Sequence, residues 1–98
     1  NFLICNICNK KGTYPQVGAY QSEKSPYYSW YRFSDFPDKY EAWWGVPTLP
    51  ETNEADPDFI EYIAGESGIA HKWLSLGADG FRLDVADELP DFFLKKLR

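Results

Sequence analysis

Apolar and charged residues alternate near the C-terminal end of the chain, in the order Phe81, Arg82, Leu83, Asp84, Val85. In an extended chain, successive side chains project from opposite faces, so the two charged residues share one face and the three apolar residues share the other. The stretch "ADGFRLDV", residues 78–85, is therefore predicted to form a β-strand. A charged pair buried among apolar neighbours costs roughly several kcal/mol unless its geometry is very good. Spacing alone leaves two interpretations open: an exposed face with a surface ion pair, or a pair retained for its chemistry.

Helical patterns precede this strand. In "ADPDFIEYIAG", Asp56 is the expected N-cap, Pro57 the first helical residue and Gly65 the end of the helix. The apolar stripe of this helix comprises Phe59, Ile60 and Ile63. A second helix is expected between a cap at Ser67 and a stop at Gly77.

A third helix is expected after the strand, in "LPDFFLKKLR", where Pro90 stands early and the basic residues stand late, as the helix dipole favours. Helix, strand and helix with short connections are the order of an α/β unit with a parallel sheet. One parallel strand cannot form a sheet by itself. The pattern therefore predicts an α/β fold class and a piece of a larger domain.

The first half of the chain is less regular. Residues 1–24 are expected to form a loop after a short strand, and Ser25 and Pro26 are expected to start a short helical turn. The following residues carry too many Pro and Gly for long regular elements. We predict a loop-rich, aromatic segment over residues 1–56 and a helix–strand–helix segment over residues 57–98.

Size and charge exclude several classes of function. Ninety-eight residues suit one small domain or a piece of a larger one, and the net charge of −5 argues against nucleic-acid and anionic-membrane partners. No apolar run approaches the ~18 residues that a membrane span needs. No N-terminal segment has the order of a signal peptide. A soluble, cytoplasmic protein is expected.

Aromatic residues make up 18% of the chain and crowd into residues 27–44, "YYSWYRFSDFPDKYEAWW". Aromatic rings carry large buried area, so a core role is the first interpretation for any single ring. Sugar rings also pack their C–H faces on aromatic side chains, so a sugar contact is the second. On this second interpretation the chain could be a non-catalytic carbohydrate-binding module, which is the alternative function that the sequence leaves open.

The sequence pattern gives little support for a metal-binding site. Cys5 and Cys8 form an isolated C-x-x-C, and the single histidine, His71, lies far along the chain on an expected helix. A structural zinc site needs four ligands. The acidic residues near the C-terminus do not have the spacing of an EF-hand calcium loop. No metal ligand set is assigned.

Two motifs carry a resemblance to a known family. "DGFRLDVADELP" resembles the fourth-strand motif of the α-amylase superfamily of glycoside hydrolases, whose pattern is D-G-x-R-x-D-x-x. "LPETN", residues 49–53, is similar to the third-loop motif of the neopullulanase and cyclomaltodextrinase group, of the Met-Pro-Lys-Leu-Asn type. The aromatic run also looks like the loop domain of this group, so the resemblance covers about residues 12–98.

The resemblance implies a fragment of a (β/α)8 TIM barrel, comprising the third-loop domain, helix 3, strand 4 and the start of helix 4. It implies part of the catalytic domain of a retaining α-glucan hydrolase that cleaves α-1,4 and also α-1,6 glucosidic bonds. Asp84 matches the nucleophile. Arg82, on the same strand face, would position this carboxylate and keep it ionised.

Further roles follow from the same resemblance. Asp87 and Glu88 stand where the neopullulanase group has Asn-Glu, and with Asn53 and Trp44 they are expected to contact an α-glucan oligosaccharide or polysaccharide. No cofactor is certain. The resemblance leaves room for a structural calcium ion and for self-association into a homo-oligomer.

Some family features have no counterpart in the sequence. The third-strand motif would precede Asn1, and the general-acid Glu and the transition-state Asp would follow Arg98. Retaining hydrolysis needs two carboxyl groups, so the 98-residue chain is expected to be inactive by itself. The opening residues, "NFLICNICNK", do not match the family, and the origin of residues 1–11 stays open.

Overall fold

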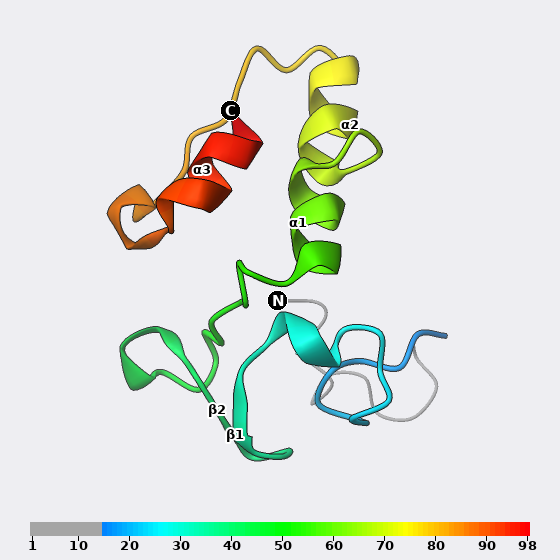
Figure 1. Cartoon of the computed structure of the whole chain (residues 1–98), viewed down its shortest axis with the longest axis vertical. Coiled ribbons are helices and arrows are strands. Elements are labelled where there is room, and N and C mark those ends of the chain that lie inside the picture. Colours follow the sequence, from blue (N-terminus) through cyan, green and yellow to red (C-terminus); the bar gives the residue numbers. More distant parts are fainter. Residues whose placement is uncertain (1–14) are drawn as a thin grey trace. The chain divides into compact units, whose positions relative to one another are not determined.

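The computed structural model describes residues 15–98 (Figure 1). The chain divides into two compact units, with the boundary between Asn53 and Glu54. The first unit is described here from residue 15 to Asn53, and the second runs from Glu54 to Arg98. The short strand expected near the N-terminus, Cys5 and Cys8 lie outside the described residues. The predicted boundary between a loop-rich segment and a helix–strand–helix segment, after residue 56, refers to domains of a larger protein and stays a prediction.

The first unit is built around a small antiparallel hairpin of β1 (Phe33–Asp35) and β2 (Lys39–Tyr40). Phe33 lies opposite Tyr40 in the register. Isolated bridges extend the pairing on both sides of the hairpin, between Tyr31 and Thr52 and between Ala42 and Pro50. The segment that ends in "LPETN" is therefore held against the hairpin by backbone hydrogen bonds.

A short helical turn follows Ser25, as predicted, but it begins later in the chain. The 3₁₀ turn η1 spans Tyr28–Trp30 and its N-cap is Tyr27, without a side-chain cap. The Ser25 hydroxyl instead accepts a hydrogen bond from the Tyr27 N–H at 3.1 Å and donates one to the Val17 carbonyl at 2.6 Å. Ser25 is buried and fixes the chain just before the turn, so its predicted role as N-cap was wrong.

Several rings of the aromatic run pack on one another inside the first unit. Tyr28 stacks on Phe33 with ring centroids 5.0 Å apart, and Phe36 meets Phe33 edge-on at 5.2 Å. Trp30 and Tyr31 are buried, at 5% and 6% exposure. Because rings bury large apolar area, these residues supply the core of a unit that has little regular structure. The core interpretation therefore holds for this part of the run.

The second unit consists of helices α1 (Pro57–Ala64), α2 (Ile69–Ser75) and α3 (Asp91–Leu97), with a 3₁₀ turn, η3, at Ala86–Glu88. Helix α1 contacts both α2 and α3. Phe59 on α1 and Phe93 on α3 stack with ring centroids 6.0 Å apart, and Phe93 is buried. This pair anchors the small core of the second unit.

The predicted ends of α1 are confirmed. Asp56 is the N-cap, and its Oδ1 accepts hydrogen bonds from the backbone N–H groups of Asp58 and Phe59, both at 2.9 Å. Pro57 is the first helical residue and Gly65 the C-cap. The third helix also starts after Pro90, and Lys95 and Lys96 stand in its last turn.

The predicted start of the second helix was wrong by one residue. Gly68, and not Ser67, is the N-cap of α2. At Gly68 a Cβ atom would lie 2.8 Å from the Glu61 carbonyl oxygen and 2.9 Å from that of Tyr62, so only glycine fits this close turn between helices. The predicted end is confirmed, because Gly77 has φ +100° and follows the C-cap Leu76.

The strand predicted over residues 78–85 is absent from the second unit. Residues 78–83 belong to no helix or strand, and Asp84 and Val85 form a turn. A strand exists through hydrogen bonds to a partner strand, and the second unit offers none. Phe81, Leu83 and Val85, the apolar set of the alternating pattern, are 48%, 38% and 45% exposed.

The fold class is thus α/β in its coarse form, with helices and a two-stranded sheet. The sheet is antiparallel and lies in the first unit, so no parallel strand of a barrel is formed between residues 15 and 98. None of the helices between residues 15 and 98 has the length and apolar character needed to cross a membrane.

Candidate functional site

Arg82 and Asp84 form an ion pair, with Arg82 Nη2 3.5 Å from Asp84 Oδ1. Their side chains are 90% and 88% exposed, so the pair lies in solvent and is not buried among the apolar residues that alternate with it. An ion pair in water contributes about 0–1 kcal/mol to stability. The pair therefore does little for this fold, while it holds a carboxylate and a guanidinium side by side at the surface.

Further acidic residues follow Asp84 in the turn that begins there. Val85 adopts φ 46° and ψ 41°, a left-handed conformation that is unusual for a β-branched residue. The chain reverses there and enters η3, which contains Asp87 and Glu88, both exposed. Three of the predicted site residues, Asp84, Asp87 and Glu88, thus belong to one exposed turn.

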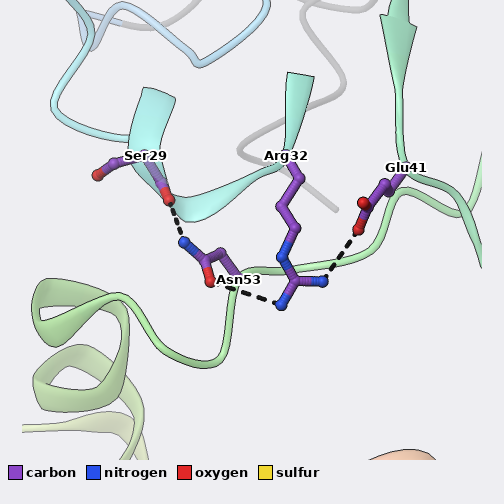
Figure 2. Close-up of polar contacts among 4 residues, drawn as sticks. All are labelled: Ser29, Arg32, Glu41 and Asn53. Carbon is purple, nitrogen blue, oxygen red and sulfur yellow. Dashed lines mark hydrogen bonds and ion pairs between the residues drawn. The ribbon is translucent and has the colours of Figure 1, made fainter. Parts of the chain in front are cut away.

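Both ends of the Asn53 amide make hydrogen bonds within the first unit (Figure 2), and so does its backbone N–H. Its Nδ2 donates to the Ser29 carbonyl at 3.1 Å, and its backbone N–H donates to the Trp30 carbonyl at 2.7 Å. Its Oδ1 accepts from Arg32 Nη2 at 3.5 Å. The last residue of the "LPETN" motif is therefore held in a fixed orientation.

Arg32 continues this network to the other side of the hairpin. Its Nη1 donates to Glu41 Oε2 at 3.0 Å (Figure 2). The Glu41 backbone N–H donates to the Arg32 carbonyl at 2.9 Å. Sequence reasoning did not single out Arg32 or Glu41. Their pairing could have been found from the hairpin register, because residues directly opposite on two strands interact through their side chains.

Trp44 is the most exposed large aromatic residue among those described, at 82%. It lies in the 3₁₀ turn η2 (Trp43–Gly45), where it has φ 51° and ψ 28°. Two hydrogen bonds close the surrounding loop, from Trp43 N–H to the Leu49 carbonyl at 2.8 Å and from the Tyr40 hydroxyl to the Pro47 carbonyl at 2.6 Å. The loop thereby presents the Trp44 ring to solvent, where it is open to stacking by a flat apolar face.

A shallow hollow of about 260 Å³ adjoins the same loop. Its lining includes Ser34, Asp38, Lys39, Tyr40, Gly45 and Pro47. Hydroxyl, carboxylate and ammonium groups are the partners that sugar hydroxyls use for hydrogen bonds. The first unit therefore offers an exposed ring and polar groups within one loop and hairpin.

A metal site is not evident in the described part of the chain. Between residues 15 and 98 there is no group of three or more His, Cys, Asp or Glu side chains that could hold an ion. His71, on α2, is exposed. The structural calcium ion stays a prediction that these residues do not test.

Comparison with known proteins identifies the relatives of this chain. No protein-family model matches it. It is 35% identical over 92% of its length to amylopullulanase from Thermoanaerobacterium thermosulfurigenes, of which it covers 6%. It is 33% identical over 80% of its length to neopullulanase 2 from Thermoactinomyces vulgaris, of which it covers 14%. The intracellular maltogenic amylase of Bacillus subtilis is 32% identical over 78% of the chain, which covers 13% of that enzyme.

The chain thus spans between 6% and 14% of the length of the curated relatives that it matches. These relatives are the enzymes that the strand and loop motifs pointed to, so the resemblance stated from sequence is confirmed. The chain is therefore similar to a segment of amylopullulanase, neopullulanase and maltogenic amylase, and this similarity is consistent with a fragment of an α-amylase-type glycoside hydrolase.

Proposed function

We propose that this chain forms part of the catalytic domain of a retaining α-glucan hydrolase, with Asp84 as the nucleophile. The observation that carries the proposal is the Arg82–Asp84 ion pair in a segment whose relatives are amylase- and pullulanase-type enzymes. The pair contributes little to the stability of this fold, so a role in chemistry accounts for it better than a role in packing.

In this mechanism the Asp84 carboxylate attacks the anomeric carbon of the sugar. A bond forms between that carbon and a carboxylate oxygen while the glycosidic C–O bond breaks, and a general acid gives its proton to the leaving oxygen. Water then attacks the same carbon, loses its proton to that group and releases Asp84. The sugar leaves with its original configuration.

The general acid must lie about 5–5.5 Å from the nucleophile. Asp87 and Glu88 follow Asp84 on the same turn, and the Asp56 carboxylate is engaged as the cap of α1. We therefore assign the acid to another part of the catalytic domain, which makes the 98-residue chain inactive by itself.

Arg82 would hold Asp84 in its attacking orientation through their ion pair. A guanidinium offers a rigid planar fork of donors, which a lysine ammonium cannot reproduce. Arg82→Lys is therefore not a conservative change at this site.

A (β/α)8 barrel would supply what residues 78–83 lack in this structure. Neighbouring strands would pair with their backbone, and packed helices would cover the exposed Phe81 and Leu83. An apolar hollow of about 210 Å³, lined by these two residues together with Leu94 and Leu97, agrees with a surface that the larger domain covers. Catalytic groups of such barrels stand at the C-terminal ends of strands, where Asp84 would then lie.

The substrate class is an α-glucan oligosaccharide or polysaccharide with α-1,4 and α-1,6 bonds. Asp87 and Glu88 are proposed to contact sugar beside the nucleophile, and Trp44 to stack on a sugar ring. Asn53 is also proposed to contact sugar, because it is the last residue of the "LPETN" loop motif. A cytoplasmic location is proposed from the intracellular maltogenic amylase among the relatives.

A non-catalytic carbohydrate-binding module is the second candidate, and the 82% exposure of Trp44 favours it. The helices α1, α2 and α3 count against it, because binding modules of this length are usually all-β. The relatives named above are hydrolases, which also favours the first candidate.

The test compares three proteins on maltotriose, cyclodextrin and pullulan, with new reducing ends as the readout. The whole protein encoded by the complete reading frame is expected to release reducing ends, and the isolated 98-residue chain is not. Asp84→Asn in the whole protein should lower kcat by about 10⁴-fold or more, because the covalent step is lost. An Asp84→Asn enzyme with near-normal kcat would remove the assignment, and sustained turnover by the isolated chain would show that the acid lies within it.

A further inference from the structure

We propose that Arg32 and Glu41 are positioning residues that orient Asn53, and with it the "LPETN" segment, for glucan binding. This inference rests on the proposed function, which places Asn53 among the substrate contacts. The three side chains come from separate places in the first unit: Arg32 precedes β1, Glu41 follows β2, and Asn53 ends the segment bridged to the hairpin.

The two atoms of the Asn53 amide meet partners of opposite kinds (Figure 2). Nδ2 donates to the Ser29 carbonyl at 3.1 Å, and a carbonyl can only accept. Oδ1 faces Arg32 Nη2 at 3.5 Å, and a guanidinium can only donate. A 180° rotation of the amide would set acceptor against acceptor and donor against donor. The network therefore selects one orientation of Asn53.

Glu41 fixes the guanidinium that makes this selection. The bond from Arg32 Nη1 to Glu41 Oε2, at 3.0 Å, is short and joins opposite charges, whereas the contact of Nη2 with Asn53 is longer. Because the guanidinium is planar, holding one nitrogen at Glu41 directs the other toward Asn53. A lysine at this position would offer one ammonium and could not serve both acceptors.

The network is accessible to solvent and can therefore act on a ligand. The side chains of Arg32 and Glu41 are 41% and 53% exposed. Exposed ion pairs contribute little to stability, so variants of this pair are expected to remain folded. The effect to be measured is thus a change of orientation and affinity.

The hairpin provides a matched control. Lys39 and Asp35 form another ion pair there, with Nζ 3.7 Å from Oδ2 and side chains 72% and 73% exposed. Asp35→Asn removes a surface carboxylate from the same hairpin, as Glu41→Gln does, and leaves the atoms around Asn53 in place.

The experiment uses the full 98-residue chain, labelled with ¹⁵N, and follows the side-chain NH₂ and backbone N–H signals of Asn53 by NMR. In Arg32→Gln and Glu41→Gln we expect the Asn53 NH₂ signals to shift and to exchange with water faster, and in Asp35→Asn we expect no change. Arg32→Lys should behave like Arg32→Gln. Asn53 signals that stay unchanged in Arg32→Gln would overturn the proposal.

Maltotriose binding, followed by the same spectra, tests the link to glucans. Arg32→Gln should weaken binding about three- to tenfold, and it should have no further effect in an Asn53→Ala background, because contacting residues act non-additively. Equal affinities of Arg32→Gln and the unaltered chain would overturn the role in binding. If the unaltered chain binds no maltotriose while the Asn53 signals respond as expected, the assignment of Arg32 and Glu41 as positioning residues stands and the glucan contact proposed for Asn53 fails.

Discussion

At the scale of single residues, burial of Tyr31 gives the first unit a dependence on alkaline pH. Tyr31 is 6% exposed, and burial raises the pKa of its phenol from 10.0 to about 12. The charged phenolate is disfavoured inside the unit because it cannot be solvated there. The folded state therefore holds the phenol proton more tightly than the unfolded chain does.

The free energy of unfolding should fall as pH rises through this interval. Below pH 10 the Tyr31 phenol is protonated in both the folded and the unfolded state, and its contribution to the free energy of unfolding is fully present. Between pH 10 and about 12 the unfolded chain has released this proton while the folded state still holds it, so unfolding becomes more favourable. Denaturant unfolding followed by tryptophan fluorescence should show a midpoint denaturant concentration that decreases above about pH 9.5, where phenols begin to titrate.

Tyr31→Phe is the matched control, because it keeps the ring and removes the titrating group. Its midpoint should decrease less over the same interval. Some decrease should remain, since the hydrogen bond to Asp38 raises the pKa of Tyr20. Identical pH profiles for Tyr31→Phe and the unaltered chain would contradict the account of Tyr31.

From the sequence, the candidate site could be predicted only where its residues are close neighbours along the chain. Arg82 and Asp84 stand two residues apart, so their proximity follows from their spacing in the sequence, although the strand predicted to carry them is absent. The contact of Arg32 with Glu41 joins residues nine apart and exists only in one register of the hairpin. Without that register, sequence reasoning could propose a role for Asn53 but could not find the residues that orient it.

At the scale of elements, the cap of α1 gives a second prediction. Asp56 Oδ1 accepts from two backbone N–H groups at 2.9 Å, and α1 is only eight residues long. Asp56→Ala leaves both groups without this partner and should lower the free energy of unfolding of the second unit by about 0.5–2 kcal/mol. Thermal unfolding followed by helical circular dichroism measures this.

Asp56→Asn is the control for this change. An asparagine oxygen accepts the same hydrogen bonds and ranks with aspartate as an N-cap. Asp56→Asn should therefore lower the free energy of unfolding by only a small part of the decrease in Asp56→Ala. A loss of equal size in both variants would show that charge, and not capping, explains the role of Asp56.

Helices were easier to predict than strands in this chain because their signals are local. Asp56 and Pro57 fixed the start of α1, since capping and proline geometry act within one turn. Gly68 replaced Ser67 as the cap of α2 because the carbonyl oxygens of α1 approach it closely, which is a contact between elements. The strand over residues 78–85 depends on partner strands that no local pattern supplies.

At the scale of the whole molecule, the exposed apolar residues indicate a larger assembly. Besides Phe81, Leu83 and Val85, the second unit exposes 68% of Leu76 and 53% of Trp73. A small domain that folds alone buries most such residues. Together with the 6–14% of each relative that the chain covers, this supports the interpretation of the chain as one segment of a larger protein.

The proposed function requires above all that Asp84 forms a covalent bond with the sugar. The measurement is to treat the whole protein with a fluorinated glucosyl fluoride, which slows release of the intermediate, and to locate the sugar by peptide mass spectrometry. Trypsin cuts after Arg82 and Lys95, so Asp84 lies in the peptide of residues 83–95. We expect one added fluoroglucosyl group on Asp84 in this peptide, and none in Asp84→Asn. A sugar attached to a carboxylate elsewhere, or hydrolysis with inverted configuration and no adduct, would contradict it.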